Sequence, residues 1–292
     1  MNGLHFKRNY FEGWYFKQNN GEHTIVFIPS YHIDQKGKLN ARLQLITDNS
    51  AHCFTFPAEK FHFEKKPFCA KIGGSVFSLK GASLNIDDAA YKITGELVFG
   101  NLTAPKYDIM GPFAFVPLLQ CRHSLISLKH TVDGHIKIND SRFDFVNGQG
   151  YIEGDRGSSF PERYLWTQCN INDTAVMLSI ATVRALSINF LGAICSIYYK
   201  DKEYRIASYL GAKVLEFSEK SASLKQGKMR FSVTQLSAAP QILHAPVDGM
   251  MGRLIRESPS CSVRYTFSIG NDTVFDIISP NAGFEYSDNA KG

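Results

Sequence analysis

Two acidic residues, Glu153 and Asp155, stand two positions apart in the segment Gly150-Tyr151-Ile152-Glu153-Gly154-Asp155-Arg156. On an extended backbone their side chains point to the same side. Two carboxylates on one face repel each other, and a proton held between them relieves the repulsion. The spacing therefore predicts a general acid. The alternative is that Arg156 pairs with Asp155, which would make the cluster a structural ion pair.

A third carboxylate stands among aromatic residues, in Tyr10-Phe11-Glu12-Gly13-Trp14-Tyr15-Phe16-Lys17. Burying a carboxylate is costly unless it is paired, hydrogen-bonded or protonated. We therefore expect Glu12, Trp14 and Tyr15 to line a binding pocket. The alternative is an amino-terminal strand that plugs one end of a barrel, with Glu12 at the rim.

Two further patterns place polar groups on one face of a strand. Cys121 and His123 share a face, but residues two apart on one strand are poorly placed to activate each other. Cys121 is therefore expected to be a small buried hydrophobe, and His123 is a candidate for proton transfer. Trp166, Gln168 and Asn170 also alternate onto one face; the alternative for the two amides is a stripe that faces solvent.

The elements that must position these residues are strands, because nearly every periodic segment has a period of two. β-branched and aromatic residues fill these segments, and turn residues follow at intervals of about eight to twelve residues. The fold class is therefore predicted to be all-β. The predicted strands are Thr24–Ile28, Arg42–Thr47, Phe61–Glu64, Ser75–Leu79, Tyr91–Phe99, Leu125–Lys129, Ile136–Ile138, Phe143–Phe145, Ala175–Thr182, Ile194–Tyr199, Tyr204–Leu210, Met229–Gln235, Cys261–Ile269 and Val274–Ile278.

Turn residues predict how these strands are connected. Hairpin turns are expected at Asn19-Asn20-Gly21, Asp133-Gly134 and Gly270-Asn271-Asp272. Pro246, Gly249 and Gly252 limit the best helical candidate, Leu243–Ile255, to a short turn. The strand rhythm breaks at Asn147–Gly150, which predicts two domains, residues 1–147 and residues 148–292.

The composition excludes several classes of function. The net charge of +5 comes from 32 basic and 27 acidic residues without a basic run, so no nucleic-acid partner is expected. The longest nearly apolar stretch, Leu186–Tyr199, is too short and too polar to span a bilayer, although a transient contact with a membrane remains open. Six scattered cysteines and the absence of an apolar core in Met1–Tyr10 predict free thiols and a cytoplasmic location.

No pattern in the chain predicts a metal ion or an organic cofactor. The sequence has no phosphate-binding loop, no zinc helix and no nucleophile elbow, and its histidines lack the spacing of metal ligands. Aromatic residues, by contrast, make up 13% of the chain, which favours both strands and an apolar ligand.

Four blocks together resemble the tocopherol cyclase-like family, which is related to carotenoid hydratases and other lipocalin-like isomerases and cyclases. The third block is the most specific, because it combines Glu-x-Asp, Phe-Pro and Trp-x-Gln-x-Asn in one segment. The blocks follow the family's order and are Tyr10–Lys17, Met110–Pro117, Gly150–Asn170 and the tail from Ala245-Pro246-Val247-Asp248-Gly249-Met250 to Ala282-Gly283-Phe284-Glu285-Tyr286.

The resemblance implies two consecutive lipocalin-like antiparallel β-barrels, with a pocket formed largely by the first. It also implies acid-catalysed cyclisation, isomerisation or hydration of a prenylated apolar substrate. The chain departs from the family at Arg156, where a Trp is usual, and at Gly154, where a Lys is common. The implied general acids are Asp155 and Glu153 with His123 as proton-transfer partner, and the implied substrate-binding residues are Glu12, Trp14, Tyr15, Arg156, Trp166, Gln168 and Asn170.

Three hypotheses follow for the function. The first is an enzyme in which Glu153 or Asp155 borders an enclosed cavity. The second is a carrier of lipids or quinones that uses the same cavity without chemistry, with the carboxylates facing solvent or Arg156. The third is a barrel filled by its own side chains, in which no cavity of about 300 Å³ exists.

Overall fold

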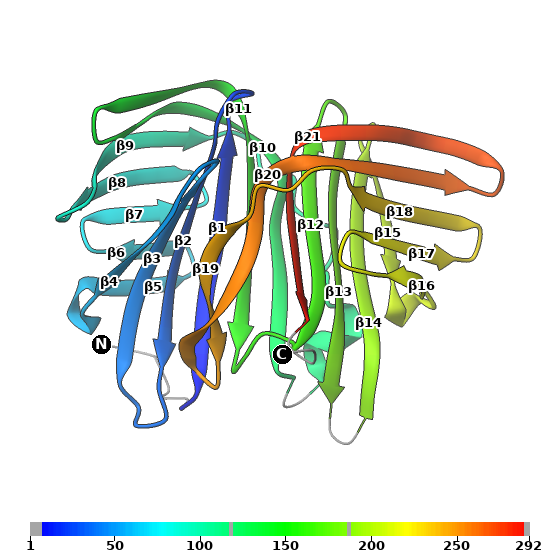
Figure 1. Cartoon of the computed structure of the whole chain (residues 1–292), viewed down its shortest axis with the longest axis horizontal. Helices are drawn as coiled ribbons and strands as arrows, with labels where there is room; N and C mark the ends of the chain where they lie inside the picture. Colours follow the sequence, from blue (N-terminus) through cyan, green and yellow to red (C-terminus); the bar gives the residue numbers. More distant parts are fainter. Residues whose placement is uncertain (1–7, 117–118, 186–187, 289–292) are drawn as a thin grey trace.

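The chain folds into two antiparallel β-sheets that stand side by side (Figure 1). The computed structural model describes residues 8–116, 119–185 and 188–288, and these contain strands and three short 3-10 helices but no α-helix. The all-β prediction is therefore confirmed. Met1–Lys7 of the amino terminus, Pro117 of the second block and Leu186-Ser187 of the apolar stretch lie outside the described residues.

The first sheet has 11 strands in the order β4-β3-β2-β1-β11-β10-β9-β8-β7-β6-β5. Its two end strands, β4 and β5, follow each other along the chain and are joined by the 3-10 helix η1 (Ala58–Lys60), so the sheet curls into a nearly closed barrel. The strands are β1 Tyr10–Asn19, β2 Thr24–Ile33, β3 Leu39–Thr47, β4 Ala51–Phe56, β5 Phe61–Lys65, β6 Phe68–Ile72, β7 Ser75–Ser78, β8 Gly81–Asp87, β9 Lys92–Phe99, β10 Cys121–Ile138 and β11 Ser141–Gly157.

The second sheet has ten strands and repeats the same winding, in the order β15-β14-β13-β12-β21-β20-β18-β17-β16, with β19 paired to β20. Its end strands β15 and β16 are joined by η3 (Ser208–Leu210), and η2 (Gly111–Phe115) lies in the connection between β9 and β10. The strands are β12 Arg163–Ile171, β13 Thr174–Ala185, β14 Ile188–Tyr199, β15 Lys202–Ala207, β16 Lys213–Phe217, β17 Ser221–Gln226, β18 Met229–Gln235, β19 Gln241–Val247, β20 Met250–Ile269 and β21 Asp272–Asp288.

Each sheet wraps around an apolar core of its own. The first core contains Phe16, Phe27 and Phe77, and the second contains Phe231 and Phe267, all fully buried. Large side chains thus fill the interior of both barrels. The burial of these aromatic side chains is the main favourable contribution to the stability of each sheet.

A third apolar cluster joins the two barrels to each other. It contains Tyr15 and Tyr151 from the first sheet and Trp166, Met177 and Leu243 from the second. The period of two explains how one strand serves both clusters: on β1, Phe16 points into the barrel and Tyr15 points out of it. The central strands are therefore buried on both faces.

The segment predicted to form a short turn, Leu243–Ile255, is a β-hairpin instead. β19 and β20 pair with Val247 opposite Met250, and Asp248 and Gly249 between them have positive φ angles of 47° and 72°. Such a two-residue loop matches the twist of the flanking strands. The β19–β20 hairpin crosses in front of the gap between the two sheets (Figure 1).

Side-chain amides fix this hairpin to the first sheet. Gln44 on β3 donates from Nε2 to the carbonyl oxygen of His244 (3.2 Å) and accepts from the His244 N–H at Oε1 (2.9 Å). Gln241 Nε2 donates to the carbonyl oxygen of Asp48 (3.2 Å). The hairpin is therefore a bridge between the barrels.

Two predicted breaks of the strand rhythm are bulges within long strands. Asp133-Gly134 is no hairpin turn, because β10 continues through it with a register shift at Gly134, whose φ is 124°. Asn147, with a φ of 52°, lies within β11, which runs on to Gly157. The chain passes from one sheet to the other over residues 158–162, and the division into domains at residue 147 stays a prediction.

Two observations concern the predicted free thiols and the predicted lack of a membrane span. All six cysteines are free thiols. Among the described residues, no helix is long and apolar enough to cross a membrane.

Candidate functional site

A cavity of about 190 Å³ lies between the two barrels. Residues of β1–β3, β10 and β11 line it from the first sheet, and residues of β12–β14 and β19–β21 line it from the second. The pocket implied by the resemblance was expected largely within the first barrel, and that expectation is wrong because the barrel interior is filled. The volume is also smaller than the roughly 300 Å³ expected for a binding site.

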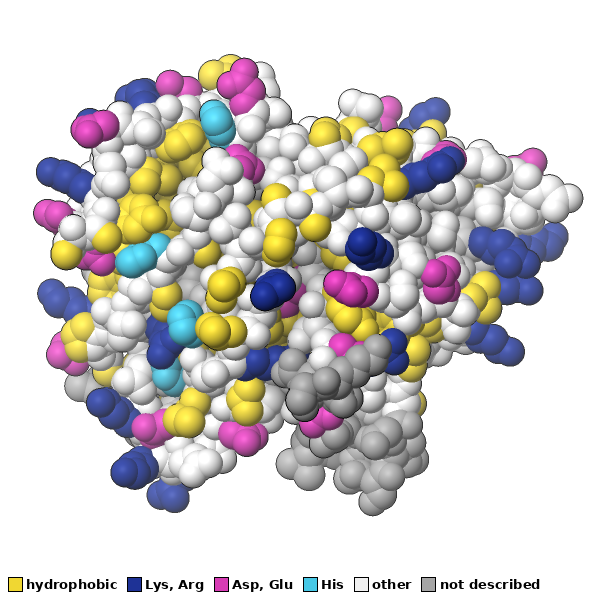
Figure 2. All heavy atoms as spheres, viewed as in Figure 1, with side chains coloured by type: hydrophobic (Ala, Val, Ile, Leu, Met, Phe, Trp, Pro, Cys, Tyr) yellow, Lys and Arg dark blue, Asp and Glu magenta, His cyan; other side chains and the backbone are white. Residues whose placement is uncertain are grey.

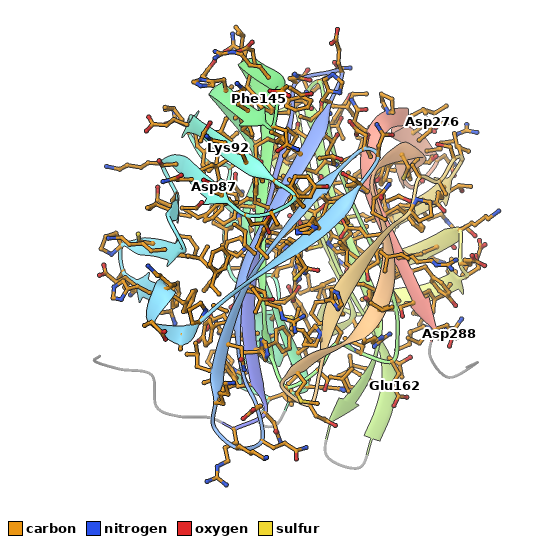
Figure 3. The ribbon with its side chains drawn as sticks, turned by 60° about the vertical axis from the view of Figure 1, so that its left-hand side comes forward. Asp87, Lys92, Phe145, Glu162, Asp276 and Asp288 are labelled. Atoms are coloured by element: carbon orange, nitrogen blue, oxygen red, sulfur yellow. The ribbon has the colours of Figure 1, made fainter. Side chains whose placement is uncertain are left out.

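The residues that line the cavity differ from one end of it to the other. Pro161, Pro246 and Met251 line it near the end of the molecule at which Glu162 and Asp288 lie in Figure 3, opposite to Phe145 and Asp276. The acidic residues lie further from this end of the molecule. On the β12–β21 pair, Glu285 lies opposite Trp166, three positions away from Asp288. Pro161 and Met251 are partly exposed, whereas Glu257 and Glu285 are buried, so the apolar end is the mouth of the cavity.

Alternation along β1 and β11 sends the predicted site residues to opposite faces of the first sheet. Tyr15, Glu153 and Asp155 face the cavity between the barrels. Glu12 lies on the other face, where its Oε2 accepts hydrogen bonds from Tyr10 (3.0 Å) and Tyr31 (2.8 Å). Glu12 was expected to line a binding pocket, but it does not line this cavity.

His123 lies between Glu153 and Asp155 and separates them. Its Nδ1 is 3.1 Å from Asp155 Oδ1, and its Nε2 is 3.2 Å from Glu153 Oε2. Burial lowers the pKa of His123, but the charges of Glu153 and Asp155 outweigh this and hold that pKa well above its ordinary value. A protonated imidazole between two carboxylates thus replaces the shared proton that the spacing suggested.

Two aromatic side chains also donate to Glu153. Trp166 Nε1 donates to Oε2 (3.0 Å), and so does the hydroxyl of Tyr151. Trp166 belongs to β12, so the first barrel's carboxylate is held by a donor from the second barrel. Burial and the adjacent Glu153 carboxylate raise the pKa of Tyr151 well above 10, which keeps its hydroxyl a donor.

A second pair of carboxylates, Glu257 and Glu285, faces the first across the cavity. The two residues stand directly opposite each other on β20 and β21, and both are buried. The hydroxyl of Tyr15 donates to Glu257, and that of Tyr164 donates to Glu285. Adjacent carboxylates without a cation between them favour a bound proton.

The pKa values of this pair follow from burial. Burial raises the pKa of Glu257 to about 7, although the Tyr15 hydrogen bond and the positive charge of Lys17 lower it. Burial and then the charge of Glu257 raise the pKa of Glu285 well above its ordinary value. The cavity therefore contains a carboxylic acid that holds a proton near neutral pH.

Of the other predicted site residues, some line the cavity and some do not. Arg156 pairs across the strands with Glu12 and points away from Asp155, so the alternative ion pair is not formed. Gln168 is buried between the barrels and Asn170 is half-buried, and neither lines the cavity. Trp14 borders the cavity, but its ring packs against Phe63 inside the first barrel (centroids 4.3 Å apart).

Cys121 is a cavity residue whose thiol is held protonated. Its Sγ lies 3.5 Å from Asp155 Oδ1. Burial, and after it the charge of Asp155, raises the pKa of the Cys121 thiol well above 9. Cys121 was expected to be a small buried hydrophobe; it is half-buried, and its raised pKa makes the thiol unreactive.

Sequence reasoning missed Glu257 and Glu285. Glu285 stands between Phe284 and Tyr286, which is the pattern that singled out Glu12, so the same argument would have found it. Glu257 follows Ile255 at the period of the hairpin's buried face. That signal required β20 to be recognised as one long strand.

Three side chains of the site have ligand atoms close enough to hold a metal ion. His123, Glu153 and Asp155 each offer one such atom within 4.8 Å of the others. His123 Nδ1 already hydrogen-bonds Asp155, and Nε2 lies 3.2 Å from Glu153 Oε2 without a hydrogen bond. The two carboxylates favour a protonated ring, and a protonated ring cannot ligate a metal ion.

Known proteins resemble this chain in sequence and in fold. Residues 80–217 match the family model described as tocopherol cyclase-like, and this range includes β10, β11 and β12. A protein of Oryza sativa subsp. japonica named "Probable tocopherol cyclase, chloroplastic" is 23% identical over 137 residues, which are 44% of this chain. The match spans 29% of the rice protein's length.

Solved structures share the architecture of the whole chain. The crystal structure of CghA with Sch210972 superposes with a TM-score of 0.62 at 9% identity, covering 96% of this chain and 88% of CghA. That of NE1406 from Nitrosomonas europaea superposes with a TM-score of 0.52 at 12% identity, covering 94% of this chain and 91% of the other. These similarities confirm the two-barrel, lipocalin-like fold.

Proposed function

Because the chain belongs to the tocopherol cyclase-like family, we propose that it catalyses a proton-driven cyclisation, isomerisation or hydration of a prenylated apolar molecule between its two barrels. One observation carries the proposal. The same apolar-walled cavity is bordered by a carboxylic acid pair, Glu257 and Glu285, and by a cluster of net negative charge, Glu153, His123 and Asp155.

The two groups supply the two proton transfers of a cyclisation. A proton leaves the Glu257–Glu285 pair and forms a C–H bond with one carbon of a prenyl double bond, leaving a tertiary cation. A hydroxyl oxygen of the substrate forms the C–O bond to that cation and loses its proton to Glu153 or Asp155. The product is an isomer of the substrate, and exchange with water returns both sites to their starting protonation.

Aromatic side chains surround the place where the positive charge forms. Tyr15 and Trp166 line the cavity with ring centroids 5.4 Å apart, and aromatic faces attract cations. The burial of the site also keeps water away from the cation. In a hydration, a water molecule would take the place of the substrate hydroxyl.

The cavity's size limits what it holds at one time. About 190 Å³ accommodates the reacting ring and double bond, so the rest of a prenyl chain extends towards the apolar mouth. Loading of such a molecule through the mouth, from a lipid surface, follows from this arrangement. A cytoplasmic location remains part of the proposal.

The experiment that tests the proposal is turnover of geranyl hydroquinone in D₂O, followed by mass spectrometry. Cyclisation by the route above adds one carbon-bound deuterium to the product. We expect Glu257→Gln to lower the rate by about 100-fold, since general acids contribute about that much. Asp155→Asn is expected to lower it as well.

Glu12→Gln is the matched control, because Glu12 is a carboxylate on the opposite face of β1. The Glu12→Gln variant should convert the hydroquinone at the wild-type rate. If the wild type binds the hydroquinone and returns it without deuterium, the protein is a carrier and the catalytic proposal is wrong.

A further inference from the structure

Lys17 is buried between the two barrels, although it does not line the cavity. Within residues 8–116, 119–185 and 188–288 it is the one lysine with a buried side chain, at 4% exposure. Burying an ammonium group is costly unless charges or hydrogen bonds compensate for it. Its role is not explained by the proton transfers above.

The strand geometry places Lys17 one pleat deeper than the carboxylic acid pair. Lys17 and Tyr15 point to the same face of β1, and Tyr15 donates to Glu257. Lys17 Nζ donates to the carbonyl oxygen of Asn281 (2.7 Å), which lies on β21, the strand that carries Glu285. Lys17 is thus fixed to the second barrel from the first.

We propose that Lys17 is a positioning residue that keeps one of the two glutamates, Glu257 and Glu285, ionised at neutral pH, so that the pair holds a single proton. A nearby ammonium stabilises one negative charge on the pair, and mutual repulsion of the two carboxylates opposes the second. The number of protons bound by the pair does not depend on a substrate. Only the use of that proton in catalysis rests on the proposed function.

The other groups around the pair differ from Lys17 in their charge or in the glutamate on which they act. The tyrosines are neutral, because burial and the carboxylates raise the pKa values of Tyr15 and Tyr164 well above 10. The cluster around His123 has a net negative charge. The positive charge of Arg253 lowers the pKa of Glu285, whereas that of Lys17 lowers the pKa of Glu257. The titratable and charged groups that act on the pair are Tyr15, Lys17, Glu153, Asp155, Tyr164 and Arg253.

The pKa of Lys17 itself fits this role. Burial lowers the pKa of Lys17 to about 8, and electrostatic interactions with Cys261, Glu257, Cys169 and Asp48 partly oppose this lowering, so the ammonium form prevails at pH 7. Glu257 and Lys17 therefore favour each other's charged forms.

The test is an infrared titration of the protonated carboxyl C=O band on ligand-free protein in D₂O, with Glu257→Gln assigning the band. We expect a midpoint near pH 7 in the wild type and a rise of at least one pH unit, or tenfold in proton affinity, in Lys17→Met. Lys17→Arg should stay within half a unit, because it keeps the charge. An unchanged midpoint in a folded Lys17→Met protein would overturn the proposal.

Lys129→Met is the matched control. Lys129 is also a lysine between the barrels, with Nζ 4.8 Å from the ring centroid of Tyr198, and it does not act on the acid pair. The carboxyl band of Lys129→Met should titrate with the same midpoint as that of the wild type.

A second measurement does not depend on whether Lys17 variants fold. In protein with ¹³C-labelled lysine side chains, Glu257→Gln should lower the Lys17 midpoint by at least half a pH unit, because coupling between two sites is reciprocal. No change in that midpoint would contradict the inference. Neither titration uses substrate, so a failure of the hydroquinone assay leaves their outcome intact.

Discussion

Each buried carboxylate of the site has a donor that offsets part of the cost of burying it. Glu153 accepts from Trp166 and faces His123, Glu257 accepts from Tyr15, and Glu285 accepts from Tyr164. A carboxylate buried without such partners would be protonated or would destabilise the fold. The pairing keeps four acidic groups in one apolar cavity, each in a different electrostatic environment.

The pKa of Glu257 makes the stability of the fold depend on pH. The folded protein has a Glu257 pKa of about 7 against an ordinary value of 4.5, so it binds the proton more tightly than the unfolded chain. The resulting stabilisation is fully present below pH 4.5 and is lost as the pH rises through 7. We expect the unfolding free energy to fall by about 3 kcal/mol more in the wild type than in Glu257→Gln between pH 4.5 and 8.

Urea denaturation at these two pH values measures that difference. Glu12→Gln serves as the control and should follow the wild type, since it leaves the acid pair unchanged. If Glu257→Gln keeps the full pH dependence of the wild type, Glu257 does not hold the proton.

At the scale of the strand, the period of two predicts which segments are extended but not where the long strands end. The predicted strands Leu125–Lys129 and Ile136–Ile138 are parts of β10, because Gly134 forms a bulge where a turn was expected. A glycine next to an aspartate has the same local signature in both settings. Only the pairing with the neighbouring strands distinguishes a bulge from a hairpin turn.

The orientation of β1 could not be predicted from its own residues. Trp14 and Phe16 face the first barrel's core, and Tyr15 faces the second barrel, so both faces are apolar. A strand buried on both sides loses the alternation that normally identifies the inner face. The sequence therefore predicted that Glu12, Glu153 and Asp155 are site residues, but it did not show that they lie on two different faces of the sheet.

Strand β21 approaches β12 closely at Gly283, and this approach positions Trp166. A Cβ at Gly283 would lie 2.9 Å from the Trp166 ring atoms Cη2 and Cζ3. We expect Gly283→Ala to displace the indole from Glu153 and to destabilise the fold by about 1–3 kcal/mol, as overpacking does. Denaturation and tryptophan fluorescence measure both effects, since the chain has two tryptophans.

Gly252→Ala on β20 is the control for this substitution. Nothing lies within 4 Å of its Cβ position, so stability should change by less than about 0.5 kcal/mol. Equal effects of the two substitutions would show that Gly283 does not position Trp166.

At the scale of the whole molecule, the site exists only where the two barrels meet. The sheets have the same winding, and each places an aromatic residue opposite a glutamate: Tyr15 opposite Glu153, and Trp166 opposite Glu285. Each aromatic donates to a carboxylate of the other barrel, Tyr15 to Glu257 and Trp166 to Glu153. Docking of the barrels and assembly of the site are therefore one event.

Three elements that contribute lining residues to the cavity also carry exposed apolar side chains. Phe115 on η2 is 85% exposed, Leu191 on β14 lies beside the lining residue Gly192, and Val247 and Met250 form the tip of the β19–β20 hairpin. Figure 2 shows hydrophobic side chains in the middle of the face over which this hairpin runs. Exposed apolar side chains gathered at an apolar opening are typical of a site that contacts a lipid surface.

We therefore predict that the protein co-sediments with vesicles of phosphatidylcholine and phosphatidylglycerol. A Val247→Asp, Met250→Asp double variant should bind at least fivefold less, because it places two charges where the chain is expected to enter the interface. Val146→Asp is the control: Val146 is 81% exposed, next to Phe145 at the opposite end in Figure 3, and should bind like the wild type. Equal loss in both variants would mean that the mouth is not the surface that meets lipid.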